Sequence, residues 1–230
     1  MNIRFATAES KIAGWRGVHA WVEAIAVAAA PREVIALNAG AGTSDVLERV
    51  ICLSHANIRF DRVDIVDAAV NHPAVRNTWR CSVENMPMVA DEAYDMVVAK
   101  WLLEHVRNVA AALSEFSRVL RPGGCLIAAV PNPVAPEFLI ARFSPMKFHK
   151  LFKPGGFETH YSFRSIGALV GLARRVGLET IEIVYSPDTA SYVANAIPQL
   201  APLGRGYDYV ALRLRMRSLL GQCIVSMRKL

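Results

Sequence analysis

Two glycines and one carboxylate have the types and spacing of a nucleoside-binding site. Residues 34–44 form an apolar run that enters a Gly-x-Gly turn at Gly40 and Gly42, and we expect a helix over 45–51. Glycines let the backbone bend sharply and approach a ligand beside the free N–H groups of the following helix. Asp64 lies 22 positions beyond Gly42, at the end of the next expected strand, where a carboxylate can accept hydrogen bonds from ribose. Together these residues predict a pocket for an adenine nucleoside.

The same turn argues against a dinucleotide. A dinucleotide fingerprint needs a third glycine three positions after Gly42, and the chain has Asp45 there. A carboxylate beside a pyrophosphate is electrostatically unfavourable, so NAD and FAD are not expected.

Histidines are the candidates for a general base, because histidine titrates nearest neutral pH. His105 comes just after the fourth expected strand, His160 lies shortly before an expected helix, and His149 lies between them. The alternative stays open that each is a helix-start or loop histidine bonded to the backbone. Capping of a helix by Ser162 would explain part of the segment around His160.

No metal site is predicted. The four cysteines are scattered without a C-x-x-C pair, so the motifs of zinc and redox sites are absent and disulfides are not expected. We interpret this as a reducing, cytoplasmic environment, which agrees with the lack of a signal-peptide pattern in the first residues.

Strands and helices alternate along most of the chain. This pattern is typical of βαβ units, and it predicts an α/β fold with a doubly wound, mostly parallel sheet of seven strands. The expected strands are 34–38, 58–63, 79–81, 96–100, 125–130, 178–185 and 222–228, and the expected helices are 1–30, 45–51, 109–120 and 165–176.

The 230 residues are interpreted as one domain, because no repeat, linker or low-complexity tract divides them. Residues 1–30 are its N-terminal helical region and 31–133 its ligand-binding core. Segments 134–164 and 187–220 are expected to form a lid on the acceptor side. The periodicity of 187–220 fits helix or loop, and it does not decide between them.

The net charge of +6 is unevenly placed. Residues 1–130 hold 13 Lys/Arg and 14 Asp/Glu, whereas residues 131–230 hold 13 and 6. Such an excess indicates an anionic partner, such as a phosphate, an acidic sugar, nucleic acid or a lipid headgroup. A solvated basic face is the alternative.

Several motifs in order resemble the class I S-adenosylmethionine-dependent methyltransferases, in particular methyltransferase type 11. The resemblance covers residues 34 to 133 and is far more specific than any single motif. It is carried by LNAGAGTS at 37–44, VDI at 63–65, SVENMP at 82–87, YDMVV at 94–98, LEHV at 103–106, RPGG at 121–124 and VPNP at 130–133. It implies a Rossmann-like fold and S-adenosylmethionine as the cofactor.

The resemblance also implies roles for individual residues. Asn38, Ala39, Gly40 and Gly42 border the methionine end of the cofactor, and Asp64 takes the ribose. The adenine packs on Ile65 and is capped by Ser82 and Val83, while Lys100 and Trp101 border the amino acid part. His160, with Tyr161 beside it, is our first candidate for a catalytic residue, because related enzymes place a histidine over the acceptor there. His105 is the second.

Three positions depart from the family pattern. Asn38 and Ser82 stand where an acid is usual, and Ser44 stands where a glycine is usual. Asn38 can still accept a hydrogen bond from a ligand amine through its carbonyl, but without the assistance of charge. We therefore expect weakened cofactor affinity, and a non-catalytic cofactor-binding or partner-binding protein stays an alternative.

The segment after residue 133 has a weaker resemblance to methyltransferases of polysaccharide and glycolipid assembly, based on prolines and aromatics. It predicts methyl transfer to a small-molecule or sugar-containing hydroxyl acceptor, which fits the basic charge. Methylation of RNA or a nucleoside is an alternative, although no Asn/Asp-Pro-Pro-Tyr tetrad follows the fourth strand. Residues 212–220, with three arginines, could also contact the inner face of an anionic membrane, or they pack as a lid helix.

Overall fold

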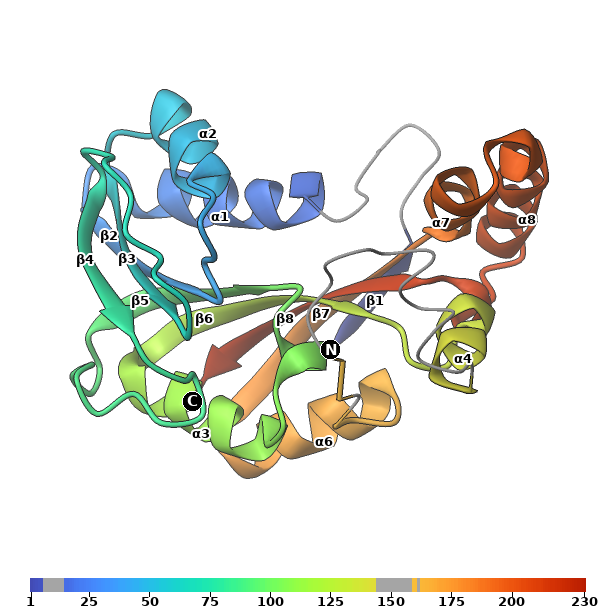
Figure 1. Ribbon diagram of the computed structural model, residues 1–230. Helices are drawn as coiled ribbons and strands as arrows, with labels where there is room; N and C mark the ends of the chain where they lie inside the picture. Colours follow the sequence, from blue (N-terminus) through green and yellow to red (C-terminus); the bar gives the residue numbers. More distant parts are fainter. Residues whose placement is uncertain (6–14, 144–158, 161) are drawn as a thin grey trace.

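The apolar runs of the sequence form one sheet of eight strands in the computed structural model, which describes residues 1–5, 15–143, 159–160 and 162–230 (Figure 1). The order of the strands is β1-β7-β8-β6-β5-β2-β3-β4. β8 runs antiparallel to β6 and β7, and the other neighbouring pairs are parallel. The strands are β1 (Asn2–Phe5), β2 (Val34–Ala39), β3 (Ile58–Asp64), β4 (Val75–Arg80), β5 (Tyr94–Lys100), β6 (Leu120–Pro131), β7 (Leu178–Ser186) and β8 (Gln222–Lys229).

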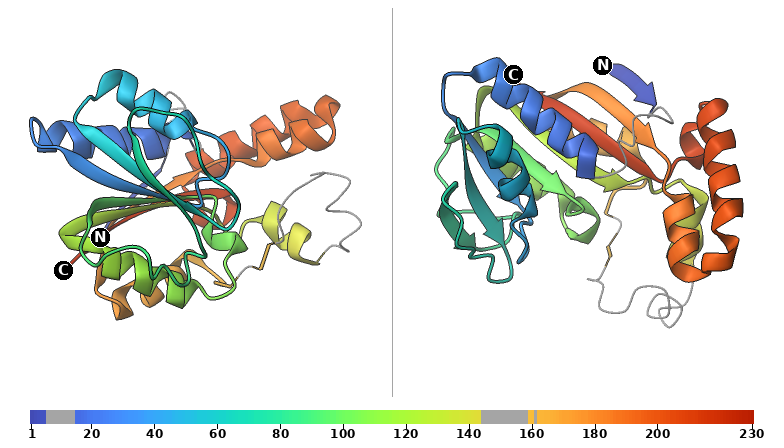
Figure 2. Two further views of the ribbon diagram at one scale, coloured as in Figure 1. Left: turned by 60° about the vertical axis from the view of Figure 1, so that its left-hand side comes forward. Right: turned by 90° about the horizontal axis from the view of Figure 1, so that it is seen from above.

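Helices cover both faces of this sheet, as Figures 1 and 2 show. α1 (Trp15–Ala29) and α2 (Val46–Ser54) lie on one face, and α3 (Val109–Val119) and α6 (Ile166–Arg175) lie on the other. Alternate residues of β5 enter the two apolar cores: Met96 and Val98 pack on the side of α1, and Val97 and Ala99 on the side of α3. Burial on both faces explains why the central strands are apolar throughout.

The predicted α/β, doubly wound fold is confirmed, with one strand more than the seven expected. The extra strand is β1, which lies in the region that the sequence predicts as helical over 1–30. β1 pairs with β7 at the edge of the sheet, and Ile3 and Phe5 pack against the core. Its four residues are too few for a clear period-two signal. The other strand boundaries shift by a few residues, most of all at the start of β6, which is Leu120 and not 125, and at the start of β4, which is Val75 and not 79.

The segment that the sequence left open, 187–220, is helical. It contains α7 (Thr189–Ala196), the 3-10 turn η2 (Pro198–Leu200), α8 (Ala201–Arg213) and the 3-10 turn η3 (Arg217–Leu219). Together with α4 (Pro136–Phe143), these helices lie beyond the end of the sheet at which β6 and β7 finish (Figure 1). Within the described ranges, no helix is both long and apolar enough to cross a membrane.

Candidate active site

The carboxyl ends of β2, β3 and β5 are the edge of the sheet at which a ligand is expected. β2 lies between β5 and β3, so the direction in which strands are added reverses there. Open α/β sheets bind their ligands at such a switch point. The Gly-x-Gly turn follows β2, Asp64 ends β3 and Lys100 ends β5. The topology therefore gathers predicted site residues at three neighbouring strand ends.

The glycine turn and Asp64 are joined by a hydrogen bond. The backbone N of Gly42 donates to Oδ2 of Asp64 over 2.8 Å, and the backbone N of Val66 donates to Oδ1 over 3.1 Å. Gly40 and Gly42 have φ values of 69° and 58°, which only glycine adopts without strain. A carboxylate accepts about four hydrogen bonds, so both oxygens of Asp64 keep acceptor capacity for a ligand.

Gly40 also meets the chain that follows β5. A Cβ placed on Gly40 would lie 2.7 Å from Cδ1 of Leu102. No side chain fits at that distance, so the turn approaches the segment before the 3-10 turn η1 (Leu103–His105) only because residue 40 has none. This close approach brings the end of β2 and the end of β5 against each other.

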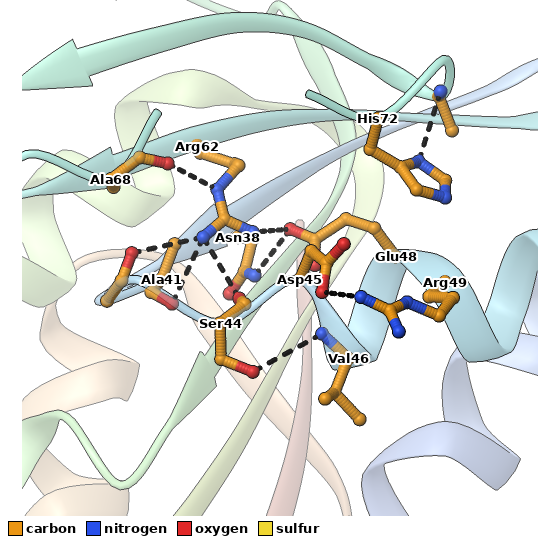
Figure 3. A network of polar contacts seen from close by, with 12 residues as sticks. Asn38, Ala41, Ser44, Asp45, Val46, Glu48, Arg49, Arg62, Ala68 and His72 are labelled. Atoms are coloured by element: carbon orange, nitrogen blue, oxygen red, sulfur yellow. Dashed lines mark hydrogen bonds and ion pairs between the residues drawn. The ribbon is translucent and has the colours of Figure 1, made fainter. Parts of the chain in front are cut away.

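A buried arginine holds the glycine turn through hydrogen bonds to its backbone, as Figure 3 shows. The side chains of Arg62 and Glu48 are both 0% exposed and form an ion pair of 2.5 Å between Nη1 and Oε1. Nε and Nη2 of Arg62 donate to backbone carbonyls, four in all, those of Ala41, Gly42, Ser44 and Ala68. Arg62 therefore fixes the path of the glycine turn through its carbonyls, while its charge is balanced by Glu48.

Asn38 belongs to the same buried network. Its Nδ2 donates to Oε1 of Glu48 over 2.8 Å, and its side chain is on the α1 and α2 side of the sheet. Ala39 is fully buried in the core. Nδ2 of Asn38 is therefore hydrogen-bonded to Glu48, and Oδ1 of Asn38 is the atom that could accept a hydrogen bond from a ligand amine.

The residues predicted to hold an adenine differ in exposure. Ile65 directly follows Asp64 and is 61% exposed, an apolar side chain beside the site with a face open to a ligand. Val83 is buried. Ser82 accepts a hydrogen bond from the backbone N of Glu84 over 3.2 Å, so its hydroxyl stabilises the local turn.

Lys100 is the last residue of β5 and Trp101 directly follows it; the first has a shifted pKa and the second a strained backbone. Burial lowers the pKa of Lys100 to about 7, far below the ordinary range for lysine. Trp101 has a φ of 53°, a strained conformation for a residue with a side chain, and its backbone N donates to the carbonyl of Ala129 over 2.9 Å. Strained backbone and a lysine that is readily neutral both lie at the expected ligand edge.

The two candidate catalytic histidines lie on adjacent segments of chain. The backbone N of His160 donates to the carbonyl of Glu104 over 2.8 Å, and the hydroxyl of Ser162 donates to the carbonyl of Val106. His105 is the last residue of η1, with Nε2 3.9 Å from Oε1 of Glu104. The structure thus brings together two segments whose histidines are 55 positions apart in the chain. Tyr161 and His149 lie outside the described residues.

Sequence reasoning missed the residues beneath the turn. Arg62 and Glu48 were not predicted, although Arg62 shares a period-two row with the apolar Ile58 and Phe60 of an expected buried strand. A charge on a buried face needs a partner, so that row was a usable signal. Leu102 carried no signal, because its contact with Gly40 joins segments that are far apart in the chain.

The helices beyond the end of the sheet have a polar core of their own. The hydroxyl of Thr189 donates to Oε1 of Glu137 over 3.1 Å, and the backbone N of Ala190 donates to Oδ2 of Asp208 over 2.9 Å. Burial raises the pKa of both carboxyl groups. These contacts connect α4 with α7 and α8.

Comparisons with known proteins agree with this geometry. Residues 37–128 match the family model described as a methyltransferase domain. The ubiquinone biosynthesis O-methyltransferase of Colwellia psychrerythraea is 27% identical over 122 residues, which are 52% of this chain and 49% of that protein. The range 37–128, which the family model matches, contains the glycine turn, Asp64 and η1.

These matches support a class I S-adenosylmethionine-dependent methyltransferase. Solved structures show the same fold. An S-adenosylmethionine-dependent methyltransferase from Mesorhizobium loti has a TM-score of 0.59 at 17% identity, over 94% of this chain and 100% of that one. The 1,6-didemethyltoxoflavin-N1-methyltransferase of Burkholderia thailandensis, solved with S-adenosylhomocysteine, has a TM-score of 0.54 at 16% identity, over 92% and 78%.

The residues at this edge fit S-adenosylmethionine, the cofactor of the methyltransferases that the chain resembles. Asp64 presents acceptors at the turn, and Ile65 presents an apolar surface beside them. The chain spans about half the length of the curated relatives it matches.

Proposed function

We propose that this methyltransferase transfers a methyl group from S-adenosylmethionine to a hydroxyl of a small-molecule or sugar-containing acceptor. The observation that carries the proposal is the 2.8 Å hydrogen bond between Gly42 and Asp64, which joins the two halves of the cofactor motif at one strand edge. The curated relatives named as ubiquinone biosynthesis O-methyltransferases support oxygen as the methylated atom.

In this proposal the chain holds the cofactor through named groups. Asp64 accepts hydrogen bonds from the ribose hydroxyls, and Ile65 packs on the adenine, with Ser82 and Val83 at its edge. The turn at Gly40 and Gly42, next to Ala39, receives the methionine end, where the carbonyl of Asn38 accepts from the amine. Lys100 and Trp101 border the amino acid part. When bound, S-adenosylmethionine supplies an electrophilic methyl group.

The acceptor hydroxyl must lose its proton to the protein. We assign that role to His160, with His105 as the second candidate, since the two segments are hydrogen-bonded beside the end of β5. Histidine exchanges a proton near neutral pH, which suits a general base. Positioning of the hydroxyl in line with the methyl group supplies much of the remaining rate.

The acceptor is proposed to be anionic. Residues 131–230, which include the lid helices, hold 13 Lys/Arg against 6 Asp/Glu. A phosphate or carboxylate on the acceptor, or an anionic surface that presents it, matches that charge.

The test is transfer of a radiolabelled methyl group from S-adenosylmethionine into fractions of a cell extract. The proposal expects label in a small-molecule or glycolipid fraction, stable to mild base as a methyl ether is, and much less label with Asp64→Asn. Label in RNA would establish the nucleic-acid alternative instead. Binding of S-adenosylmethionine with no transfer into any fraction would leave the non-catalytic alternative.

A further inference from the structure

α7, η2 and α8 form a helical hairpin that projects beyond the end of the sheet (Figures 1 and 2). α7 and α8 pack against each other, and one face of α8 is buried there. A Cβ on Gly204 would lie 2.8 Å from Cα of Ala190, while Asp208 and Ala211 are buried on the same side. The other face of the hairpin points away from the molecule.

That outer face is apolar. Among the described residues, eight of the eighteen exposed large hydrophobic side chains fall within residues 192–216. We call this set the hairpin surface; its members are Tyr192, Ile197, Leu200, Leu203, Tyr209, Val210, Leu214 and Met216. Exposed apolar groups that gather in one place mark an interaction site.

Three of these side chains form a stripe along α8 and its last turn. Leu203, Val210 and Leu214 are 70%, 50% and 62% exposed. They are seven and four residues apart, close to two turns and one turn of an α-helix, so they lie on one line. The buried Gly204 and Ala211 lie on a different line, which means that the stripe takes no part in packing α8 on α7.

All exposed charges of this segment are positive. Within 187–220 the exposed charged residues are Arg205, Arg213, Arg215 and Arg217. The two acids of the segment, Asp188 and Asp208, are half-buried and buried. A hairpin that exposes large apolar side chains and whose exposed charges are arginines is complementary to a surface that is anionic at its boundary and apolar beneath it.

We propose that the hairpin surface docks on an anionic phospholipid membrane. Leu203, Val210 and Leu214 enter the boundary of the acyl chains, Arg205 and Arg213 reach lipid phosphates, and Tyr209, which is 65% exposed, lies at the headgroup level, where that side chain is favoured. The proposal goes beyond methyl transfer and does not depend on it.

Two other occupants fit the hairpin surface less well. In a two-fold contact between copies of this chain, the same patch faces itself, so the arginines of both copies would be brought together. RNA binding relies on phosphate contacts and base stacking, and it would leave the aliphatic stripe in water.

The experiment is sedimentation of the full-length chain with vesicles. We expect binding to vesicles of phosphatidylcholine with phosphatidylglycerol, about tenfold or more tighter than to phosphatidylcholine alone, and weaker in high salt because surface charge is screened. The variant Leu203→Ser/Val210→Ser/Leu214→Ser should lose about tenfold or more in affinity for anionic vesicles. Arg205→Gln/Arg213→Gln should lose the preference for anionic lipid.

The matched control is Leu53→Ser/Met88→Ser, which removes two apolar side chains, 82% and 72% exposed, elsewhere on the molecule. It should sediment as the wild type does, and circular dichroism should show that all variants are folded. The proposal is overturned if the wild type does not sediment with anionic vesicles, or if the triple variant and the control behave alike. It is also overturned if the triple variant instead dissociates a dimer or releases bound RNA.

Discussion

Arg62 carries a full charge inside the protein and uses it to hold a loop. The variant Arg62→Met leaves Glu48 buried without its ion pair and frees three turn carbonyls and that of Ala68, so we expect a loss of about 3–5 kcal/mol in the free energy of unfolding. The control is Arg59→Met on the same strand, which removes a partly exposed pair with Glu33 and two long hydrogen bonds to the carbonyls of Ala56 and Ile58, and should cost about 1 kcal/mol or less. Urea denaturation measures both. Equal stabilities for the two variants would show that the turn does not depend on Arg62.

The lowered pKa of Lys100 predicts that the stability of the protein depends on pH. Its folded pKa is about 7, and the ordinary value is 10.5. Between these pH values the unfolded chain binds more protons than the folded one, so this group makes the protein more stable as pH rises from about 7 towards 10.5. Lys100→Met should lack that gain.

The measurement for Lys100 is the free energy of unfolding of both proteins at pH 6.5 and pH 9. Other groups titrate in both, so the difference between wild type and variant reports the lysine. A difference that does not change with pH would mean that the Lys100 amine titrates as it does in water.

At the scale of residues, sequence reasoning located the glycine turn and the carboxylate that the structure joins, and missed the groups that support them. Gly40, Gly42 and Asp64 have a fixed spacing, which is readable without a structure. Arg62 and Glu48 are 14 positions apart and meet only because β3 and α2 pack together. Their pairing depends on tertiary contact, which spacing does not contain.

At the scale of elements, alanine variants of Gly40 and Gly42 distinguish the effect of a close contact between elements from the effect of backbone strain. Both have positive φ, so alanine at either position costs about 1 kcal/mol of strain. Gly42 has open space at its Cβ position, whereas Gly40 would also collide with Leu102. Gly40→Ala should therefore weaken cofactor binding far more than Gly42→Ala.

The double variant Gly40→Ala/Leu102→Ala tests the cause. It removes the side chain that the new methyl group meets, so it should recover part of the affinity for S-adenosylhomocysteine in calorimetry. If the double variant binds no better than Gly40→Ala, the loss of affinity in Gly40→Ala comes from backbone strain alone, and the contact between residues 40 and 102 does not affect binding.

The packing of α4 on α7 and α8 should also depend on pH. Burial raises the pKa of Glu137, and Asp208 nearby raises it further. The folded chain therefore holds a proton that the unfolded chain has lost, so this group makes the protein less stable as pH rises from about 4.5 through the folded pKa. Glu137→Gln should remove that part of the decline, which thermal unfolding between pH 4.5 and pH 8 measures. A decline as steep in the variant as in the wild type would contradict this role.

Most elements of the fold could be predicted because the apolar runs of the central strands are long. The sequence located seven strands, and the terminal strand β1 was missed because four residues at an edge show little periodicity. The helices of 187–220 were undecided, since their exposed apolar stripe disturbs the pattern of an ordinary amphipathic helix. The stripe is part of the hairpin surface, for which we propose a role in docking.

At the scale of the whole molecule, the cofactor edge and the hairpin surface belong to different parts of the fold. The family model ends at residue 128, and α4, α6, α7 and α8 follow it. The motifs of the sequence therefore locate the strand edge, and the roles of its residues stay predictions. His160 lies outside the family model, and its approach to the segment of His105 depends on a backbone contact with Glu104 that the spacing does not contain.

The central claim is that S-adenosylmethionine binds at the strand edge where Asp64 meets the glycine turn. Calorimetry should show one molecule bound per chain, and Asp64→Asn should weaken binding about tenfold or more, because hydrogen bonds to a charged group are lost. Asp67→Asn, an exposed carboxylate three residues on that accepts from the backbone N of Ala69, should bind as the wild type does. No binding by the wild type, or equal binding by Asp64→Asn and Asp67→Asn, would contradict the account.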